Sequence, residues 1–527
     1  MPQTASIRLD LRAAADFRLK VPTRRVTVVE GTDAVYHVKS DSLTGYSDDV
    51  DLSVTGLPSG ASAAIGTDPI ENDGETDITI ETVGVAAGVH YFNIDAETYA
   101  PPQDEVWAES TSLSDVQAAI TAANSGQTVR IPAGSSTWAA RLDTITTKAL
   151  GIIGAGIDQT IIKRGFTNTN DTGQAVRGLI AFSPTSSLAA TNPVFRLSGM
   201  TIDCDYRGDG PWLYNAYRQY PCTNIRLDHL KIHHATYSGS PWGYDMFGIC
   251  IGRYGAMYGV CDNSTLNGDL FASNTSDDDV WTDTAYNFGD ANNFYFEDCT
   301  ITATPVSETL CSDGNHSPRY CFRHNTLDVT DLNRGYDSPM FDIHGNQASP
   351  MRAGQGWEIY ENSIICAGIA VSFDQRGGKA MCYNNTATKT TGSLSMRVRE
   401  EHDDASVGPT PYVPNNLITG QPQHISDTYY WGNTIGGVQV DVDDSAEHVT
   451  YSGHSCPEEN YHFWNQAASF DGSVGIGIGL LAARPTSGLT AGVGYWATDT
   501  QTLYRATGAT TWETFYTPYT YPHPLRA

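Results

Sequence analysis

Basic residues are scarce in this sequence. Its 527 residues include 31 Lys and Arg against 60 Asp and Glu, which gives a net charge of −29 at pH 7. Nucleic-acid binding depends on neutralising phosphates with basic side chains, so this composition argues against a nucleic-acid partner. It also disfavours direct binding of a polyanionic glycan, unless a local basic strip or a bridging Ca²⁺ reverses the sign of the charge.

Long apolar runs are also missing. The longest run, residues 474–483, is too short and too rich in glycine to cross a bilayer, so we expect no membrane insertion. Residues 1–10 contain no apolar stretch of signal-peptide length, which predicts either another export route or a mature chain.

Metal-binding patterns are absent as well. The ten cysteines form no C-x-x-C pair, and no histidine cluster has zinc spacing, so we expect no metal site and no cofactor. Only a lyase activity would call for Ca²⁺. We expect Cys299 and Cys382 to be small buried apolar residues, whereas Cys250 and Cys261 are close enough in sequence to be a disulfide candidate.

What the sequence does contain is a repeat. One order of apolar, polar, turn and hydroxyl residues recurs at a basic step of roughly 23 to 30 residues, with insertions, which is typical of a solenoid. The units are short runs of Phe, Tyr, Ile, Val and Thr between Gly, Asn and Asp, so they favour a β-helix over a helical solenoid. The repeats are Leu197–Ile202, Leu227–Ile232, Phe296–Ile301, Phe322–Leu327, Ile359–Ile364, Cys382–Ala387 and Tyr430–Ile435.

The fourth position of this repeat predicts an internal ladder, because stacked coils place like residues above one another. The residues at that position are Cys299, Asn325, Asn362, Asn385 and Asn433.

Short alternating strands between turn residues predict a small Ig-like β-sandwich ahead of the repeats. A helix over Ser114–Asn124, with Ser114 at its N-cap, would cover the apolar end of the first coil. In chain order we expect an N-terminal arm (1–20), the β-sandwich (21–100), a linker (101–112), a parallel β-helix with its capping helix (113–445), the end of the β-helix and a connecting segment (446–484), and a small C-terminal β module with a Pro-rich tail (485–527).

The opening of the repeat region resembles a known superfamily. The helix, then Thr128–Gly134, then Leu150–Arg164 resemble the start of right-handed parallel β-helix proteins of the pectate-lyase-like superfamily. This resemblance implies an all-β protein. That superfamily includes polysaccharide lyases, glycoside hydrolases and catalytically silent phage tail proteins, so the fold does not choose an activity. Residues 50–60 and 494–505 resemble modules of bacterial surface and phage virion proteins.

Three strand-like phrases of the central repeats carry polar residues on one face. Alternation points Asp342 and His344 outward together, then Asp374 and Arg376, then Arg397 and Arg399. Stacked coils would join these pairs into one strip. Asp342, His344, Asp374 and Arg376 are therefore the candidate catalytic residues.

Two chemistries suit this strip. Two carboxylates could serve a glycoside hydrolase, and a base with a nearby cation could serve a lyase. The alternative is a solvated ladder of ion pairs with no catalytic role.

Aromatic residues gather in the insertions between repeats and could stack on sugar rings. They could equally pack down on the wall of the solenoid. The candidate substrate-binding residues are Trp212, Tyr214, Trp242, Tyr244, Trp281, Arg397 and Arg399.

The leading hypothesis is a phage-type virion surface structural protein, such as a tail spike, tail fibre or decoration protein, located on the virion surface or outside the cell. We expect it to bind surface polysaccharide, to contact other virion proteins and to form a homo-oligomer, with a trimer favoured. The second hypothesis is a polysaccharide lyase or glycoside hydrolase on the same scaffold. The third is a cellular surface or filament protein that only spaces subunits.

Overall fold

The chain forms two compact units, Met1–Glu105 and Val106–Ala527, each described here by itself. The computed structural model describes residues 4–12, 17–20, 25–29, 31–42, 50–70, 74–86, 89–98, 105–142, 145–166, 178–204, 210–217, 219–233, 247–251, 256–267, 269–272, 287–302, 312–314, 319–329, 340–343, 354, 356–367, 370–391, 394–399, 424–444, 449–451 and 454–526.

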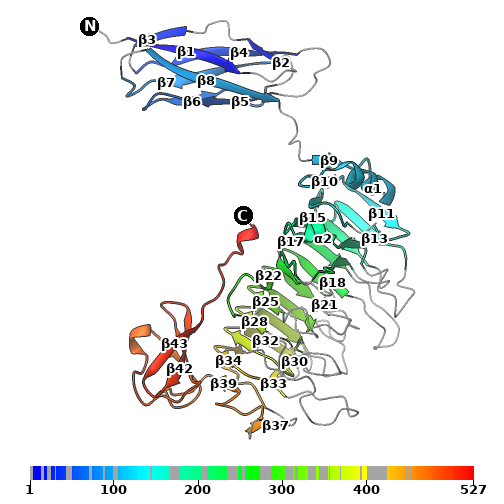
Figure 1. Ribbon diagram of the computed structural model, residues 1–527, viewed down its shortest axis with the longest axis vertical. Coiled ribbons are helices and arrows are strands. Elements are labelled where there is room, and N and C mark those ends of the chain that lie inside the picture. The colour runs from blue at the N-terminus through cyan, green and yellow to red at the C-terminus, as the bar shows by residue number, and fades with distance from the viewer. Residues whose placement is uncertain are drawn as a thin grey trace. The chain divides into compact units, whose positions relative to one another are not determined.

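The first unit is a β-sandwich of two four-stranded sheets (Figure 1). Its core is apolar because strands such as β7 alternate buried and exposed residues, with Ile78 and Ile80 pointing inward. One sheet has the order β3 (Arg25–Val29), β1 (Thr4–Arg12), β8 (Val89–Thr98) and β5 (Val50–Thr55). The other has the order β2 (Phe17–Lys20), β4 (Ala34–Ser42), β7 (Glu75–Glu81) and β6 (Ser62–Ile65).

The described parts of residues 1–20, which are β1 and β2, do not form the separate arm expected from the sequence. Strand β1 pairs with β3 and with β8, and β2 pairs with β4, so both belong to the sandwich.

The second unit is dominated by a parallel β-helix, as predicted, and the all-β fold class is confirmed. Successive coils add one strand to each of three parallel sheets, which we call the first, second and third sheets.

The first sheet contains β10 (Thr128–Ile131), β12 (Leu150–Gly154), the first halves of β15 (Val194–Asp203) and β17 (Cys222–His233), β19 (Met257–Asp262), β22 (Phe294–Glu297), β25 (Arg319–Arg323), β28 (Gly356–Tyr360), β31 (Ala380–Tyr383), β34 (Thr428–Trp431) and β39 (Phe463–Asn465). The second contains β11 (Gly134–Trp138), β13 (Thr160–Arg164), the second halves of β15 and β17, β20 (Thr265–Asn267), β23 (Thr300–Thr302), β26 (Thr326–Val329), β29 (Ser363–Ala367), β32 (Thr386–Thr391) and β35 (Thr434–Ile435).

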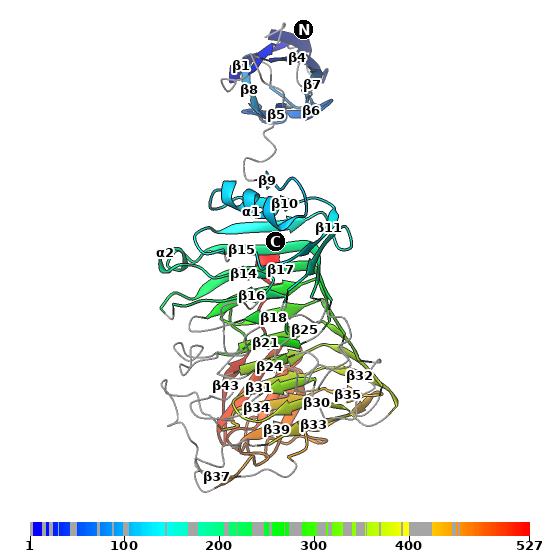
Figure 2. The same cartoon turned by 90° about the vertical axis from the view of Figure 1, so that its right-hand side faces the viewer.

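The third sheet is seen face-on in Figure 2. It contains β14 (Ile180–Phe182), β16 (Pro211–Leu213), β18 (Phe247–Ile251), β21 (Asp269–Ala272), β24 (Ser312–Gly314), β27 (Phe341–Ile343), β30 (Ala370–Gln375) and β33 (Leu394–Val398).

The capping helix is present as α1 (Leu113–Ala122), after strand β9 (Glu105–Trp107). Its N-cap is Ser112, whose side chain accepts a hydrogen bond from the backbone of Asp115, so the helix begins earlier than Ser114. Val116, Ala119 and Ile120 form its buried face, as the apolar spacing predicts. The other short elements are α2 (Ser186–Ala189), β36 (Val438–Gln439), β37 (Val449–Tyr451), β38 (His454–Cys456) and η3 (Leu481–Ala483).

The predicted asparagine ladder is confirmed. The Nδ2 atom of Asn325 donates to Oδ1 of Asn362 at 3.0 Å, and the next steps, from Asn362 to Asn385 and from Asn385 to Asn433, are both 2.9 Å. Each of the last three Oδ1 atoms also accepts the backbone N–H of the asparagine before it. The ladder therefore satisfies buried polar groups at the turns from the first to the second sheet.

Cysteines pack inside this core. Cys299 and Cys382 are buried free thiols, as predicted. The disulfide candidate was wrong, because Cys261 is also a buried free thiol. Burial raises the pKa of Cys261 well above its usual value.

The C-terminal module is a four-stranded sheet of β40 (Ile476–Gly479), β41 (Gly494–Ala497), β42 (Thr502–Gly508) and β43 (Thr511–Tyr516). It begins before residue 485, and it packs on the outer face of the first sheet (Figure 1). Tyr383 stacks on Trp431 with ring centroids 4.3 Å apart, and Trp431 in turn meets Trp496 at 5.1 Å. The tail after β43 ends in η4 (Pro524–Arg526), which contacts β17 and β19 of the same chain.

None of the helices in the described part of the chain has the length and apolar character needed to span a bilayer.

Candidate functional site

A straight column of residues runs along the third sheet. Each member is paired in register with the next one on the neighbouring coil, so the spacing is about 4.8 Å per step. We call it the third-sheet column, and its members are Ala181, Trp212, Cys250, Phe271, Asp313, Asp342, Asp374, Arg397 and Asp443. One end of the column is therefore apolar and the other end is charged.

Arginines from the following coil hold the charged end. Arg376 donates from Nε and Nη2 to the two oxygens of Asp342, at 2.7 and 2.5 Å. Arg397 donates to both oxygens of Asp374 at 2.9 and 2.5 Å, and Arg399 donates to the same two atoms at 3.3 and 3.1 Å. The described members of the predicted strip thus lie together, and they are held by paired contacts of fixed geometry.

The strip is not a solvated ladder, because its carboxylates are buried. Asp374 is 1% exposed, and Asp342 and Arg376 are also buried. Burial by itself would raise the pKa of Asp374, but hydrogen bonds from Arg397 and Arg399 outweigh it and leave that pKa below its usual value. Asp374 therefore stays ionised at neutral pH and holds no proton to donate as a general acid.

Gln375, an unusual residue for an inward position, has a structural role. Its Nε2 donates to the carbonyl oxygens of Gly377 and Gly378 and to Oγ1 of Thr428, and its Oε1 accepts a 2.5 Å bond from Tyr430. These bonds satisfy the buried amide and hold the turn that follows Arg376.

The apolar end of the column carries Trp212. Its ring stacks on Tyr214 with centroids 5.1 Å apart and an angle of 24° between the planes. Trp212 is almost fully buried and packs on Ala181, whereas Tyr214 is half-buried. Trp212 therefore packs mainly on the wall, and Tyr214 offers the more accessible ring. The predicted site residues His344, Trp242, Tyr244 and Trp281 lie outside the described residues.

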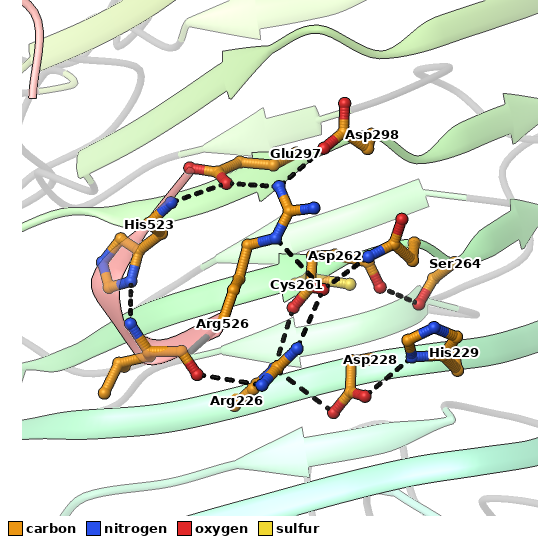
Figure 3. A network of polar contacts seen from close by, with 12 residues as sticks. Arg226, Asp228, His229, Cys261, Asp262, Ser264, Glu297, Asp298, His523 and Arg526 are labelled. Carbon is orange, nitrogen blue, oxygen red and sulfur yellow. Dashed lines mark hydrogen bonds and ion pairs between the residues drawn. The ribbon is translucent and has the colours of Figure 1, made fainter. Parts of the chain in front are cut away.

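A second polar cluster lies on the first sheet, beneath the C-terminal tail (Figure 3). Arg526 donates to Glu297 at 2.9 Å and to Asp298 at 2.6 Å, and its Nε lies 3.4 Å from Asp262. Arg226 binds Asp262 at 3.1 and 3.2 Å and donates to the carbonyl of Leu525 at 3.0 Å. The tail thus supplies a cation to Asp262 and Glu297, whose side chains have no solvent-exposed surface.

Arg323 binds the middle of the tail to the same cluster. It forms an ion pair with Glu297 and donates to the hydroxyl of Tyr360 at 2.8 Å. It also donates to the carbonyl oxygens of Tyr519 and Thr520, at 2.5 and 2.7 Å. We call these residues the tail cluster.

Sequence reasoning missed the tail cluster. The signal was present, because Asp228, Asp262, Glu297 and Arg323 occupy one register position on consecutive coils. No local sequence pattern indicated that the last residues of the chain would lie across these four side chains. The cover leaves these carboxylates unavailable to a substrate while the tail is docked.

Within the described residues, no group of three or more His, Cys, Asp or Glu residues is arranged to hold a metal ion.

Comparison with known proteins adds little. No family model matches the chain, and no curated protein matches it. Among solved structures it is similar to a family 28 exopolygalacturonase of Yersinia enterocolitica, at 11% identity and a TM-score of 0.24, over 82% of this chain and 98% of that one. A likeness at this level does not assign an activity to this chain.

Proposed function

We propose that this protein is a polysaccharide-binding surface protein of the phage virion type, and that the third-sheet column forms its contact surface through the partly exposed side chains of Tyr214, Arg397 and Arg399. The observation that carries the proposal is the column itself. It places an aromatic pair at one end and fixed Asp–Arg pairs at the other on one straight path. From Trp212 to Arg397 the path has six register steps, or about 29 Å.

This arrangement suits an extended polymer. Sugar rings can stack on an aromatic face while their hydroxyls bond to polar groups. The forks of Arg376 and Arg397 are already held by their carboxylates, so binding would freeze few side chains. Paired charges also keep the strip close to neutral, which favours a neutral or weakly charged glycan despite the acidity of the whole chain.

A binding assay against a panel of bacterial surface polysaccharides tests this proposal. We expect Tyr214→Ala and Arg397→Ala to weaken binding by about tenfold or more. Trp107→Ala is the matched control, because Trp107 is 58% exposed and lies on β9, outside the column. Unfolding temperatures would confirm that each variant is folded. Equal binding by Tyr214→Ala, Arg397→Ala and the control would count against the column, with Tyr214 stacked on its apolar end, as the binding surface.

A polysaccharide lyase or hydrolase remains the second candidate, and one observation favours it. Asp342 and Asp374 are register neighbours on adjacent strands, which lie about 4.8 Å apart. That spacing is close to the roughly 5 to 5.5 Å between the carboxyl groups of retaining glycosidases. The arginines that clamp both carboxylates weigh against it.

The same polysaccharide panel separates binding from catalysis. New reducing ends or unsaturated products that disappear in Asp342→Asn would establish an enzyme. A lyase that uses Ca²⁺ would also lose its products when a chelator is added.

The proposal includes assembly as a homo-oligomer, with a trimer favoured, that meets other virion proteins. Light scattering on the purified chain measures its mass directly. A strict monomer at high concentration would contradict this part of the proposal and leave the glycan contact to be judged by the binding assay.

A further inference from the structure

A pocket of about 390 Å³ lies at the seam between the last coil of the β-helix and the C-terminal sheet. Its size is within the range of small-ligand sites, roughly 300 to 1,000 Å³. We call it the seam pocket. Asp427, Asn460, Tyr461 and Trp464 line it from the β-helix side, and Arg505 and Glu513 line it from β42 and β43.

The polar wall of the seam pocket is held rigidly. Arg505 donates from Nη1 to Asp427 at 2.8 Å and from Nε to Glu513 at 2.7 Å. Its guanidinium lies 4.0 Å from the ring centroid of Phe515, and Lys379 binds the other oxygen of Asp427 at 2.7 Å. A preformed network of this kind loses little entropy when a ligand binds.

One acceptor in this network is open to a ligand. Both contacts from Arg505 fall on Oε1 of Glu513, so Oε2 is left to accept a bond from a ligand hydroxyl. The side chain of Glu513 is 42% exposed and lines the pocket, so a ligand there can reach it. The guanidinium donors and the carboxylate acceptors therefore lie side by side, as a sugar with vicinal hydroxyls requires.

The aromatic wall has one exposed ring and one buried ring. Tyr461 is 48% exposed and meets His462 edge to face at 4.7 Å. Trp464 is buried and stacks on Tyr429 at 4.9 Å. Gly492 closes over Trp464, since a Cβ at this position would lie 2.4 Å from the indole. The exposed face of Tyr461 is thus the surface on which a sugar ring can stack.

We propose that the seam pocket is a second glycan subsite, which takes one or two residues of a neutral sugar. This inference relies on the proposed function for its ligand class but on different residues for its contacts. Charge selects a neutral ligand, because Arg505 and Lys379 are both engaged by carboxylates and Oε2 of Glu513 would repel an acidic sugar.

Titration calorimetry on the full chain, with saturation-transfer NMR, tests the subsite. The neutral probes are cellohexaose, maltohexaose and chitohexaose, and an oligogalacturonate is the acidic probe. We expect at least one neutral probe to bind better than the acidic one, with about tenfold weaker binding in Tyr461→Ala. Glu513→Gln should also weaken it, while the exposed control Trp107→Ala should not.

A background variant keeps this test separate from the proposed function. In the double variant Tyr214→Ala, Arg397→Ala the neutral probe should still bind at the seam pocket, and adding Tyr461→Ala should remove that remaining binding. The inference is overturned if no neutral probe binds, if the acidic probe binds better, or if Tyr461→Ala binds normally. A different result would contradict the proposed function, namely polysaccharide binding that is unchanged in Tyr214→Ala and in Arg397→Ala.

Discussion

Arg323 should be more costly to remove from the first sheet than the partly exposed Arg196. Its side chain has no exposed surface, and it binds Glu297, whose side chain is equally buried. Arg323→Met would also leave the carbonyl oxygens of Tyr519 and Thr520 without their donor. Breaking one partner of a buried ion pair costs about 3 to 5 kcal/mol. Because Glu297 keeps Arg526 as a second partner, we expect a value near the lower end.

Arg196→Met is the matched control. Arg196 binds Asp228 with two contacts, at 2.7 and 2.8 Å, on the same sheet, but its side chain is 38% exposed. Asp228 is itself buried, but it keeps contacts from Ser198, His229 and Arg226 when Arg196 is removed, so Arg196→Met should cost clearly less stability than Arg323→Met.

Two measurements check the Arg323 prediction. Urea unfolding followed by tryptophan fluorescence compares the two variants, and carboxypeptidase digestion reports whether the tail has detached. Arg323→Met should unfold at lower urea and lose its tail faster. Equal stability and equal digestion rates in the two variants would refute the view that buried charge holds the tail.

Three further predictions concern the tail, the ladder and the seam. Burial lowers the pKa of His523 to about 4 in the folded chain, whereas an unfolded histidine has a pKa of about 6.5. Between these two values the unfolded chain binds more protons than the folded chain, so stability should fall as the pH falls from about 6.5 to about 4. His523→Gln should flatten that part of a pH series of unfolding midpoints, and an unchanged slope would contradict the assignment. Asn362→Ala removes the two hydrogen bonds that Nδ2 donates and the two that Oδ1 accepts, and it should cost about 3 kcal/mol in urea unfolding. A loss below about 1 kcal/mol would argue against the ladder as a stabilising element. Gly492→Ala forces a methyl against Trp464 and should shift its fluorescence and loosen the seam, and an unshifted spectrum would show that the seam has room.

Much of the fold could be predicted because it is periodic along the chain. Asn325, Asn362 and Asn385 lie one coil apart, and a repeated local pattern places them at the same point of successive coils. The strip of Asp342, Asp374 and Arg397 follows from the same periodicity.

Burial and charge pairing at the strip could not be predicted in the same way. Alternation indicates that Asp374 and Arg376 share a face, but it does not say that Arg376 binds Asp342 of the preceding coil. Nor does it say that two arginines of the next coil would neutralise Asp374. Those contacts depend on how side chains reach between coils, which the spacing of residues along one strand does not determine.

The sequence by itself determined the coil, the capping helix and the asparagine ladder, since each depends on residues within one or two repeats of each other. Only the tertiary structure decided the rest. Strand β1 joins the sandwich by pairing with β8, and Arg526 reaches Glu297 across 229 positions of the chain. Contacts between residues so far apart follow no repeat in the sequence. They form because buried surfaces and opposite charges come to face each other only after the coils have stacked.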